Sequence, residues 1–231
     1  MNSILASIKS SPVLARVIPF AVFIALTYAQ EHSGESGRYW IYLAKTVAGA
    51  WMIWAVWPAV EEMRWKFSWE AALVGVAMFA IWVSLDPLLI KLGLLNSYPK
   101  MKLSSVPWNP HAQFGDSSAL AWMFVAIRIA GSSLVVPPLE EVFFRSFLYR
   151  YLAKKDFQSI PLGAFLPVPF VLTAVLFALE HREWLAGILC GVAYQGLVLR
   201  KNRLGDAMTA HAITNFLLGL WVVWKGEWHF W

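Results

Sequence analysis

Charged residues and cysteine are both scarce in this sequence. Asp, Glu, Lys and Arg make up only 14% of the 231 residues, whereas an average soluble domain carries about 25%. So few charges cannot coat a soluble domain of this size, which excludes an ordinary soluble fold. The single cysteine, Cys190, excludes an intrachain disulfide and a CxxC metal site. The net charge of +5 is spread over short loops, so no nucleic-acid partner is expected.

Apolar residues make up 59% of the chain and fall into runs of about 20 residues, the length that a helix needs to cross a bilayer. The sequence therefore predicts an all-α integral membrane protein. We expect a polytopic transmembrane helical bundle of seven or eight spans, forming one domain over residues 1–231. The expected spans are Pro12–Gln30, Tyr39–Val60, Trp69–Ile90, Ala119–Val136, Pro161–Glu180, Trp184–Leu199 and Asp206–Trp224, with Leu139–Leu152 as the eighth if it crosses fully.

A double proline, Pro137-Pro138, interrupts the fourth of these runs, since neither ring can donate a helical hydrogen bond. We expect one helix to end before it and a second to begin at Leu139. A helix that ran through both prolines would place Glu140 far from His181 in membrane depth.

Two further segments carry expectations of their own. The first run also has the length of a signal-peptide core, with Thr27-Tyr28-Ala29 as a candidate cleavage site, but an uncleaved span is favoured because the rest of the chain is polytopic. The polar stretch Lys91–Ser118 is expected to be an irregular or interfacial loop. Tyr98 and Trp108 in this stretch suit the headgroup zone of a bilayer.

Two short basic loops are expected in the cytoplasm, because cytoplasmic loops carry an excess of Lys and Arg. This places the N-terminus inside for seven spans and outside for eight. The sequence leaves open which membrane face a site would open to. The basic residues of the two loops are Arg150, Lys154 and Lys155, and Arg200, Lys201 and Arg203.

Ionisable residues in apolar runs are costly to bury and therefore mark candidate functional sites. The first group is EEVFFR, at positions 140–145. Glu141 and Arg145 are four residues apart, so they share a helix face and can form an ion pair. Glu140 is turned about 100° away and is left free to bind water. A similar acidic pair, Glu61-Glu62, lies in a polar loop and is assigned no role.

Two further groups follow, FALEH at positions 177–181 and HAITN at positions 211–215. Each alone has a structural explanation, as a helix-end histidine or a hydrogen bond between helices. Together with Glu140 they supply an unpaired carboxylate, two imidazoles and an amide on membrane helices. These are the parts for hydrolysis by an activated water: a general base, a second base or orienting group, and donors to an oxyanion. Asp86 and Arg128 could form a structural pair or line a cavity.

Other chemistries have weaker support. A His₂Glu zinc site formed by Glu140, His181 and His211 stays open as an alternative, although the sequence has no HExxH motif. Serine catalysis lacks a GxSxG turn. Cys190 has no base beside it and lies among small residues such as Gly191, which indicate close helix packing.

In their order along the chain, the three groups resemble the motifs EExxxR, FxxxH and HxxxN of the CAAX protease and bacteriocin-processing family. The similarity covers about residues 134–220 and extends to the exosortase-associated branch. It implies a glutamate-dependent, metal-independent intramembrane endopeptidase without a cofactor. Two positions depart from the family pattern. Ser146 stands where a glycine is common, and Glu180 stands where a small or apolar residue is common.

The resemblance also implies a role for each matching residue. Glu140 and His181 would activate the attacking water, and His211 and Asn215 would form the oxyanion hole. The matching residues that would support this site are Glu141 and Arg145.

Members of this family include enzymes that remove the last three residues from prenylated CAAX proteins, and many bacterial members whose substrate is unassigned. The small size and the basic loops favour a bacterial inner-membrane protein, which would lack prenylated substrates. We expect a membrane-anchored or exported protein as the substrate, cut near its C-terminus, with a sorting system as a candidate partner. The alternative is a non-catalytic membrane immunity or binding protein of the same fold.

Overall fold

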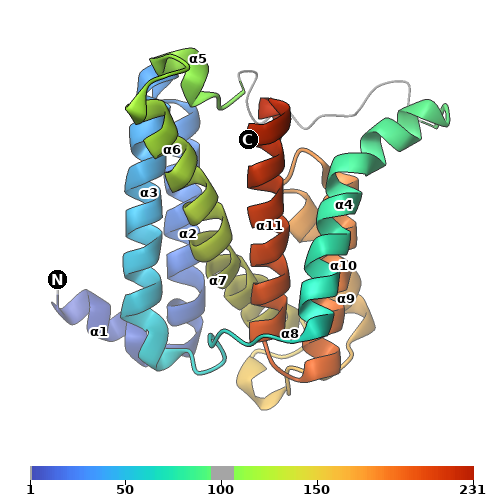
Figure 1. Ribbon diagram of the computed structural model, residues 1–231. Coiled ribbons are helices and arrows are strands. Elements are labelled where there is room, and N and C mark those ends of the chain that lie inside the picture. Colours follow the sequence, from blue (N-terminus) through green and yellow to red (C-terminus); the bar gives the residue numbers. More distant parts are fainter. Residues whose placement is uncertain (1, 95–106) are drawn as a thin grey trace.

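The computed structural model describes residues 2–94 and 107–231, and these form helices and connecting turns without a strand. The predicted all-α class is therefore confirmed. Figure 1 shows the helices side by side as an upright bundle. Of the predicted loop Lys91–Ser118, residues 95–106 with Tyr98 lie outside the described residues. The part that follows them contains a short helix, α5 (Pro110–Phe114), capped by the Asn109 side chain.

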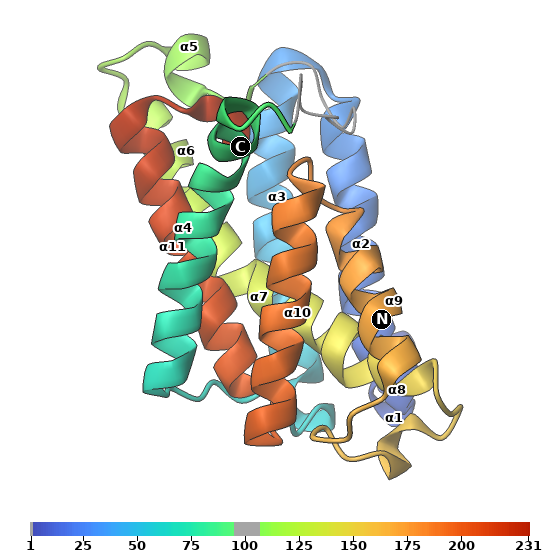
Figure 2. The same cartoon turned by 90° about the vertical axis from the view of Figure 1, so that its right-hand side faces the viewer.

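The main helices run alternately up and down the bundle (Figures 1 and 2). Four helical segments are long and apolar enough to cross a membrane: Pro12–Glu31, Trp69–Lys91, Ala119–Tyr151 and Gly205–Lys225. The chain is thus an integral membrane protein. The helices outside the Ala119–Tyr151 segment are α1 (Asn2–Ser10), α2 (Pro12–Glu31), α3 (Gly34–Val56), α4 (Trp69–Lys91), α9 (Pro167–Ala178), α10 (Trp184–Lys201) and α11 (Gly205–Lys225), with short 3₁₀ turns at Trp57–Ala59, Phe157–Ser159 and Trp228–Phe230.

Local sequence explains several helix ends. Ser11 and Ser68 cap α2 and α4 by accepting hydrogen bonds from backbone N–H groups of the first helical turn. The helix α3 begins at Gly34, earlier than predicted, because His32 and Ser33 suffice for the turn from α2. The helix α9 begins at Pro167, later than predicted, with proline at the first helical position, where its missing N–H costs nothing.

The predicted break at Pro137-Pro138 is wrong. One continuous helical segment of 33 residues runs through it, made of α6 (Ala119–Ala130), a π-helical turn (Gly131–Val135), α7 (Val136–Glu141), a second π-helical turn (Val142–Leu148) and α8 (Tyr149–Tyr151). The first π turn is closed by a hydrogen bond from the N–H of Val136 to the carbonyl of Gly131. This wide turn brings the chain to the prolines while helix geometry continues on both sides.

This segment would be about 50 Å long as a straight α-helix, whereas a bilayer core is about 30 Å thick. It crosses the bundle obliquely (Figure 1), which shortens the depth that it spans. Since Leu139–Tyr151 continues the preceding helix, it is not a separate pass, and the eight-span alternative is not realised.

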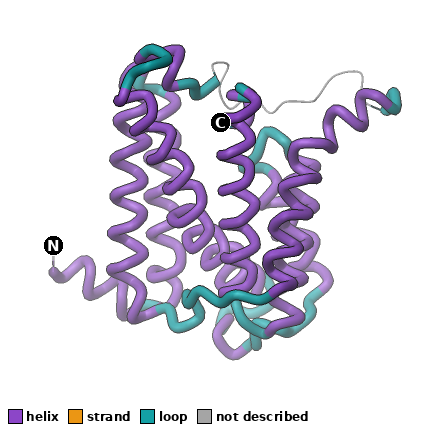
Figure 3. The backbone as a smooth tube through the Cα atoms, viewed as in Figure 1, coloured by secondary structure: helices purple, strands orange, loops and turns teal. Residues whose placement is uncertain are grey.

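The connections gather at the two ends of the bundle (Figure 3). We call one end the basic end; it holds the connections 57–68, 152–166 and 202–204. We call the other the distal end; it holds the turns 32–33 and 179–183 and the C-terminus. Both predicted basic loops lie at the basic end. The 179–183 turn sits lower in the bundle than the upper ends of α2 and α3 (Figure 2).

Small residues let helices approach closely, as predicted for the stretch around Cys190. A Cβ atom on Gly191 of α10 would lie only 2.9 Å from the Cα of Ala174 on α9. On the opposite side, a Cβ on Gly75 of α4 would lie 2.7 Å from the carbonyl oxygen of Ala210 on α11. These two contacts set the spacing of the helices that carry the candidate site.

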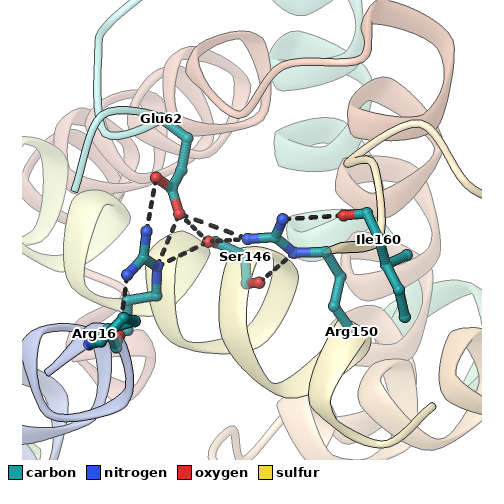
Figure 4. A network of polar contacts seen from close by, with 6 residues as sticks. Arg16, Glu62, Ser146, Arg150 and Ile160 are labelled. Atoms are coloured by element: carbon teal, nitrogen blue, oxygen red, sulfur yellow. Dashed lines mark hydrogen bonds and ion pairs between the residues drawn. The ribbon is translucent and has the colours of Figure 1, made fainter. Parts of the chain in front are cut away.

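A polar cluster at the basic end ties the N-terminal helices to the 119–151 segment (Figure 4). Arg16 of α2 donates to both carboxylate oxygens of Glu62, at 2.8 and 2.9 Å. The hydroxyl of Ser146 also donates to Glu62, and Arg150 donates to the Ser146 backbone carbonyl at 2.5 Å and its hydroxyl at 2.9 Å. Our expectation that Glu61-Glu62 has no role is therefore wrong for Glu62, and Ser146 serves this cluster.

We predict that this cluster makes stability depend on pH. Burial raises the pKa of Glu62, but the hydrogen bonds from Arg16 and Ser146 outweigh burial and hold the pKa below its ordinary value. A lowered folded-state pKa adds stability that is fully present above the unfolded pKa of about 4.3 and is lost as the pH falls through the folded pKa. Glu62→Gln should lower the unfolding free energy at pH 7 by about 1–3 kcal/mol, measured by denaturation in detergent.

The difference between the wild type and Glu62→Gln should shrink as the pH falls below about 4. Glu61→Gln, at the exposed neighbouring position, is the matched control and should leave stability unchanged. A difference that stays constant from pH 7 to pH 3 would contradict this account.

Candidate active site

A cavity of about 240 Å³ lies between the two halves of the bundle. It reaches the distal end, because the exposed Glu31 at the end of α2 and the C-terminal residue Trp231 are among its lining residues. One wall comes from α9, the 179–183 turn, α10 and α11. The lining residues of this wall include Phe177, Glu180, His181, Cys190, Tyr194, His211 and Asn215.

Glu141 anchors the deep end of this site. It is fully buried, and its Oε1 lies 2.9 Å from Nδ1 of His211 on α11. Its Oε2 lies 3.2 Å from Nε of Arg145, so the ion pair expected from the spacing is present. The Arg145 guanidinium also stacks on Phe177, 4.2 Å from the ring centroid. Because Glu141 can only accept at Nδ1, it fixes which nitrogen of His211 carries a proton and how the ring is turned.

Glu140, in contrast, has no such partner, as its position on the helix predicted. Its Oε2 atom is buried and accepts no hydrogen bond from the described residues. The basic atom nearest to it in ion-pair range is Nε2 of His211, at 3.9 Å. This gap is too long for a direct hydrogen bond and leaves the carboxylate oxygen open to a further group.

His181 faces the same cavity. Its Nδ1 lies 2.9 Å from the carbonyl oxygen of Phe177 and must donate there, so Nε2 of the neutral ring is an acceptor. The Phe177 ring lies against both imidazoles, with centroid distances of 4.8 Å to His181 and 5.9 Å to His211. The continuous helix places Glu140 3.9 Å from His211, and α9 is short with its turn deep in the bundle (Figure 2); how far Glu140 lies from His181 stays a prediction.

Asn215 lies one helical turn from His211 on the same face of α11. Its Nδ2 donates to the carbonyl oxygen of Ser132 at 2.8 Å. In the π turn this carbonyl would accept from position 137, but Pro137 has no N–H. Asn215 therefore satisfies a backbone group that the double proline leaves open, and its second amide proton stays available.

Sequence reasoning missed part of the cavity. The second wall comes from α2, α3, the segment before α5, and α6, and it holds Gln30, Lys45, Trp108 and Arg128. Of the two roles left open for Arg128, it takes the one of lining a cavity. Lys45 could have been identified from the sequence as a candidate functional residue, since it is a lysine inside an apolar span. Glu180, noted as a departure from the family pattern, also lines the cavity and interacts electrostatically with Glu140.

The zinc alternative gains no support from this geometry. Among residues 2–94 and 107–231, no three His, Cys, Asp or Glu side chains lie close enough together to hold a metal ion.

Comparison with known proteins identifies one family. Residues 118–217 match the family model "Rce1-like: Type II CAAX prenyl endopeptidase Rce1-like". The matched segment contains the six site residues expected from the sequence: Glu140, Glu141, Arg145, His181, His211 and Asn215. No curated protein and no solved structure matches the chain.

The two adjacent glutamates should differ sharply in their effect on stability. Glu141→Ala leaves the buried Arg145 without its carboxylate and should cost about 3–5 kcal/mol of unfolding free energy. Glu140→Ala removes a buried oxygen that accepts no hydrogen bond from the described residues, so it should leave the unfolding free energy unchanged or raise it by about 1 kcal/mol. Denaturation in detergent measures both; equal losses in the two variants would contradict this reading of the site.

Proposed function

Because residues 118–217 belong to the Rce1-like family of CAAX proteases, we propose that this chain is an intramembrane endopeptidase of the glutamic type, with Glu140 and His181 activating the attacking water. The observation that carries the proposal is that Oε2 of Glu140, which accepts no hydrogen bond from the described residues, lies 3.9 Å from Nε2 of His211, and that His211 lines the same cavity as His181. Leaving a buried carboxylate without a partner is costly, and such costs are typical of catalytic groups.

In the proposed reaction, a water lies between Glu140 and Nε2 of His181. Glu140 takes a proton from this water as its oxygen attacks the carbonyl carbon of the scissile bond. The same proton then passes to the leaving nitrogen as the C–N bond breaks, giving a carboxylic acid and an amine. His181, held by the Phe177 carbonyl, keeps an acceptor directed at the second proton of the water.

His211 and Asn215 would stabilise the oxyanion that forms in this attack. Asn215 has one amide proton to give, since the other is bound to Ser132. His211 donates from Nε2 in its doubly protonated form, in which Nδ1–H is held by Glu141. Glu141 and Arg145 position this ring without touching the substrate.

The orientation of the bundle supports an exported or membrane-anchored protein as the substrate. Lys and Arg gather at the basic end, which the positive-inside rule places in the cytoplasm. The cavity reaches the opposite, distal end. A substrate would therefore be cut on the exported side of a membrane, which we propose to be a bacterial inner membrane. Membership of the exosortase-associated branch and a sorting-system partner stay predictions.

The catalytic role of Glu140 can be tested before a substrate is known. The C-termini of membrane proteins are compared by mass spectrometry in cells that carry the wild type, Glu140→Gln or the control Glu61→Gln. C-termini shortened by the wild type and by Glu61→Gln should be lost with Glu140→Gln, because removing a general base costs about 10²–10⁴-fold in rate.

The same products should form from the purified enzyme in the presence of a metal chelator. If Glu140→Gln retains the shortened C-termini, the protease proposal fails. If Glu140→Gln instead preserves every phenotype of the wild type while no C-terminus changes, the non-catalytic binding or immunity alternative holds.

Cysteine labelling tests the orientation. The single native cysteine, Cys190, is buried, so it should not react with the label. Glu227→Cys introduces a thiol at the distal end and Lys155→Cys one at the basic end, both at exposed positions. A membrane-impermeant maleimide applied to intact spheroplasts should label Glu227→Cys, and should label Lys155→Cys only after permeabilisation. The reverse pattern would place the cavity on the cytoplasmic side.

A further inference from the structure

The wall of the cavity opposite the two histidines holds two basic side chains, and neither forms an ion pair with a carboxylate of the described residues, although Glu31 lines the same cavity. Lys45 of α3 is only 4% exposed. Its Nζ donates to the hydroxyl of Thr27 at 3.0 Å and lies 4.9 Å from the ring centroids of Phe23 and Tyr42. Within residues 2–94 and 107–231, no carboxylate comes within ion-pair distance of this ammonium group.

Arg128 of α6 is the second such cation. Its guanidinium stacks on two aromatic rings, 4.5 Å from the centroid of Tyr42 and 5.2 Å from that of Trp108. In the described part of the chain it too forms no ion pair with a carboxylate. Burying one cation without an ion pair is costly, and Arg128 also repels Lys45, so an anion bound between the two would lower this cost.

The same wall holds polar atoms that lack a partner. Trp108 is 1% exposed, and its Nε1–H, which can only donate, makes no hydrogen bond within the described residues. The indole is held in place by Tyr39, whose ring packs against it at a tilt and whose hydroxyl donates to the carbonyl of Asn109, the next residue. Gln30 is 4% exposed, and its Oε1 is likewise without a donor. Both residues line the cavity.

We propose that Lys45, Arg128 and the indole N–H of Trp108 form a subsite that binds the C-terminal carboxylate of the peptide substrate. Two cations and one neutral donor, set among aromatic rings, suit a small planar anion that leaves a peptide chain behind it in the cavity. This assignment rests on the proposed function, because the opposite wall of the same cavity holds His181, His211 and Asn215 of the proposed site.

The distance from the proposed catalytic residues to the subsite determines how far from the C-terminus a bound peptide would be cut. Arg128 lies one helical turn from Ser132, whose carbonyl binds Asn215, and Asn215 lies one turn from His211. The two helices run antiparallel, so both turns lead from the deep site toward the distal end (Figure 1). Two turns span about 11 Å, which is about three to four residues of extended peptide. By binding the C-terminal carboxylate, the subsite would therefore fix the number of residues between the cleaved bond and the C-terminus.

The test measures binding, so it does not depend on turnover. The probes are an N-acetylated tetrapeptide of aliphatic residues as the free acid and as the C-terminal amide. Their affinities for the purified protein in nanodiscs are measured by isothermal titration calorimetry, in the Glu140→Gln background to prevent cleavage. The free acid should bind at least 10-fold more tightly than the amide, because charge-assisted hydrogen bonds to the carboxylate are lost in the amide.

Three variants locate this preference. Arg128→Gln should reduce it to less than 2-fold, and Trp108→Phe, which keeps an aromatic ring but removes the N–H, should reduce it several-fold without lowering the unfolding temperature. Arg200→Gln, at an exposed arginine of the basic end, is the matched control and should leave it intact.

Equal binding of acid and amide by the starting protein would overturn the proposal, as would a preference that survives Arg128→Gln. Competition by inorganic phosphate without any acid preference would also overturn it, and would assign the cations to a phosphate headgroup. Because cleavage is not measured, failure of the protease proposal would leave an acid preference standing, and the two results can be told apart.

Discussion

The cost of burying Glu141 controls the arrangement of the whole site. A carboxylate that is 0% exposed inside a membrane bundle must be paired, and Glu141 is paired twice, with Arg145 on its own helix and with His211 on α11. These contacts lock the 119–151 segment against α11. Because Nδ1 of His211 is committed to Glu141, Nε2 faces Glu140, the neighbour that has no ion pair of its own on the helix. One glutamate thus contributes to stability, and the adjacent one is left for the proposed chemistry.

The backbone hydrogen bonds around Pro137 explain how the 119–151 segment bends without breaking. The π turn and Pro137 leave the carbonyl of Ser132 without a helical donor, and Asn215 supplies one from α11. On its other side α11 is held to α4, because the hydroxyl of Thr214 donates to the carbonyl of Gly75 at 2.9 Å. The irregular helix, the double proline and the amide of Asn215 therefore form one unit, so Asn215 has a structural task besides the proposed one at the oxyanion.

The fold class could be predicted from the sequence because its apolar runs have the length of membrane helices. The residues of the deep site could be predicted because ionisable groups are rare in these runs and because the spacing of Glu141 and Arg145 sets their pairing. It could not show that the helix continues through Pro137-Pro138, since that depends on a donor more than 70 residues away. The role of Glu62 was hidden for the same reason: its partners come from other helices. Lys45 was visible as a charge in an apolar span, but its place opposite the histidines needed the tertiary structure.

The central claim is that the carboxylate of Glu140 serves as the base toward water. Chemical rescue tests it most directly: the rate at which purified Glu140→Ala cleaves a substrate peptide is measured with and without added formate, which can occupy the space the side chain vacates. The account predicts that Glu140→Ala is inactive alone and regains part of its cleavage rate as formate is raised, whereas His211→Ala does not. Cleavage by Glu140→Ala at the wild-type rate without formate would contradict it.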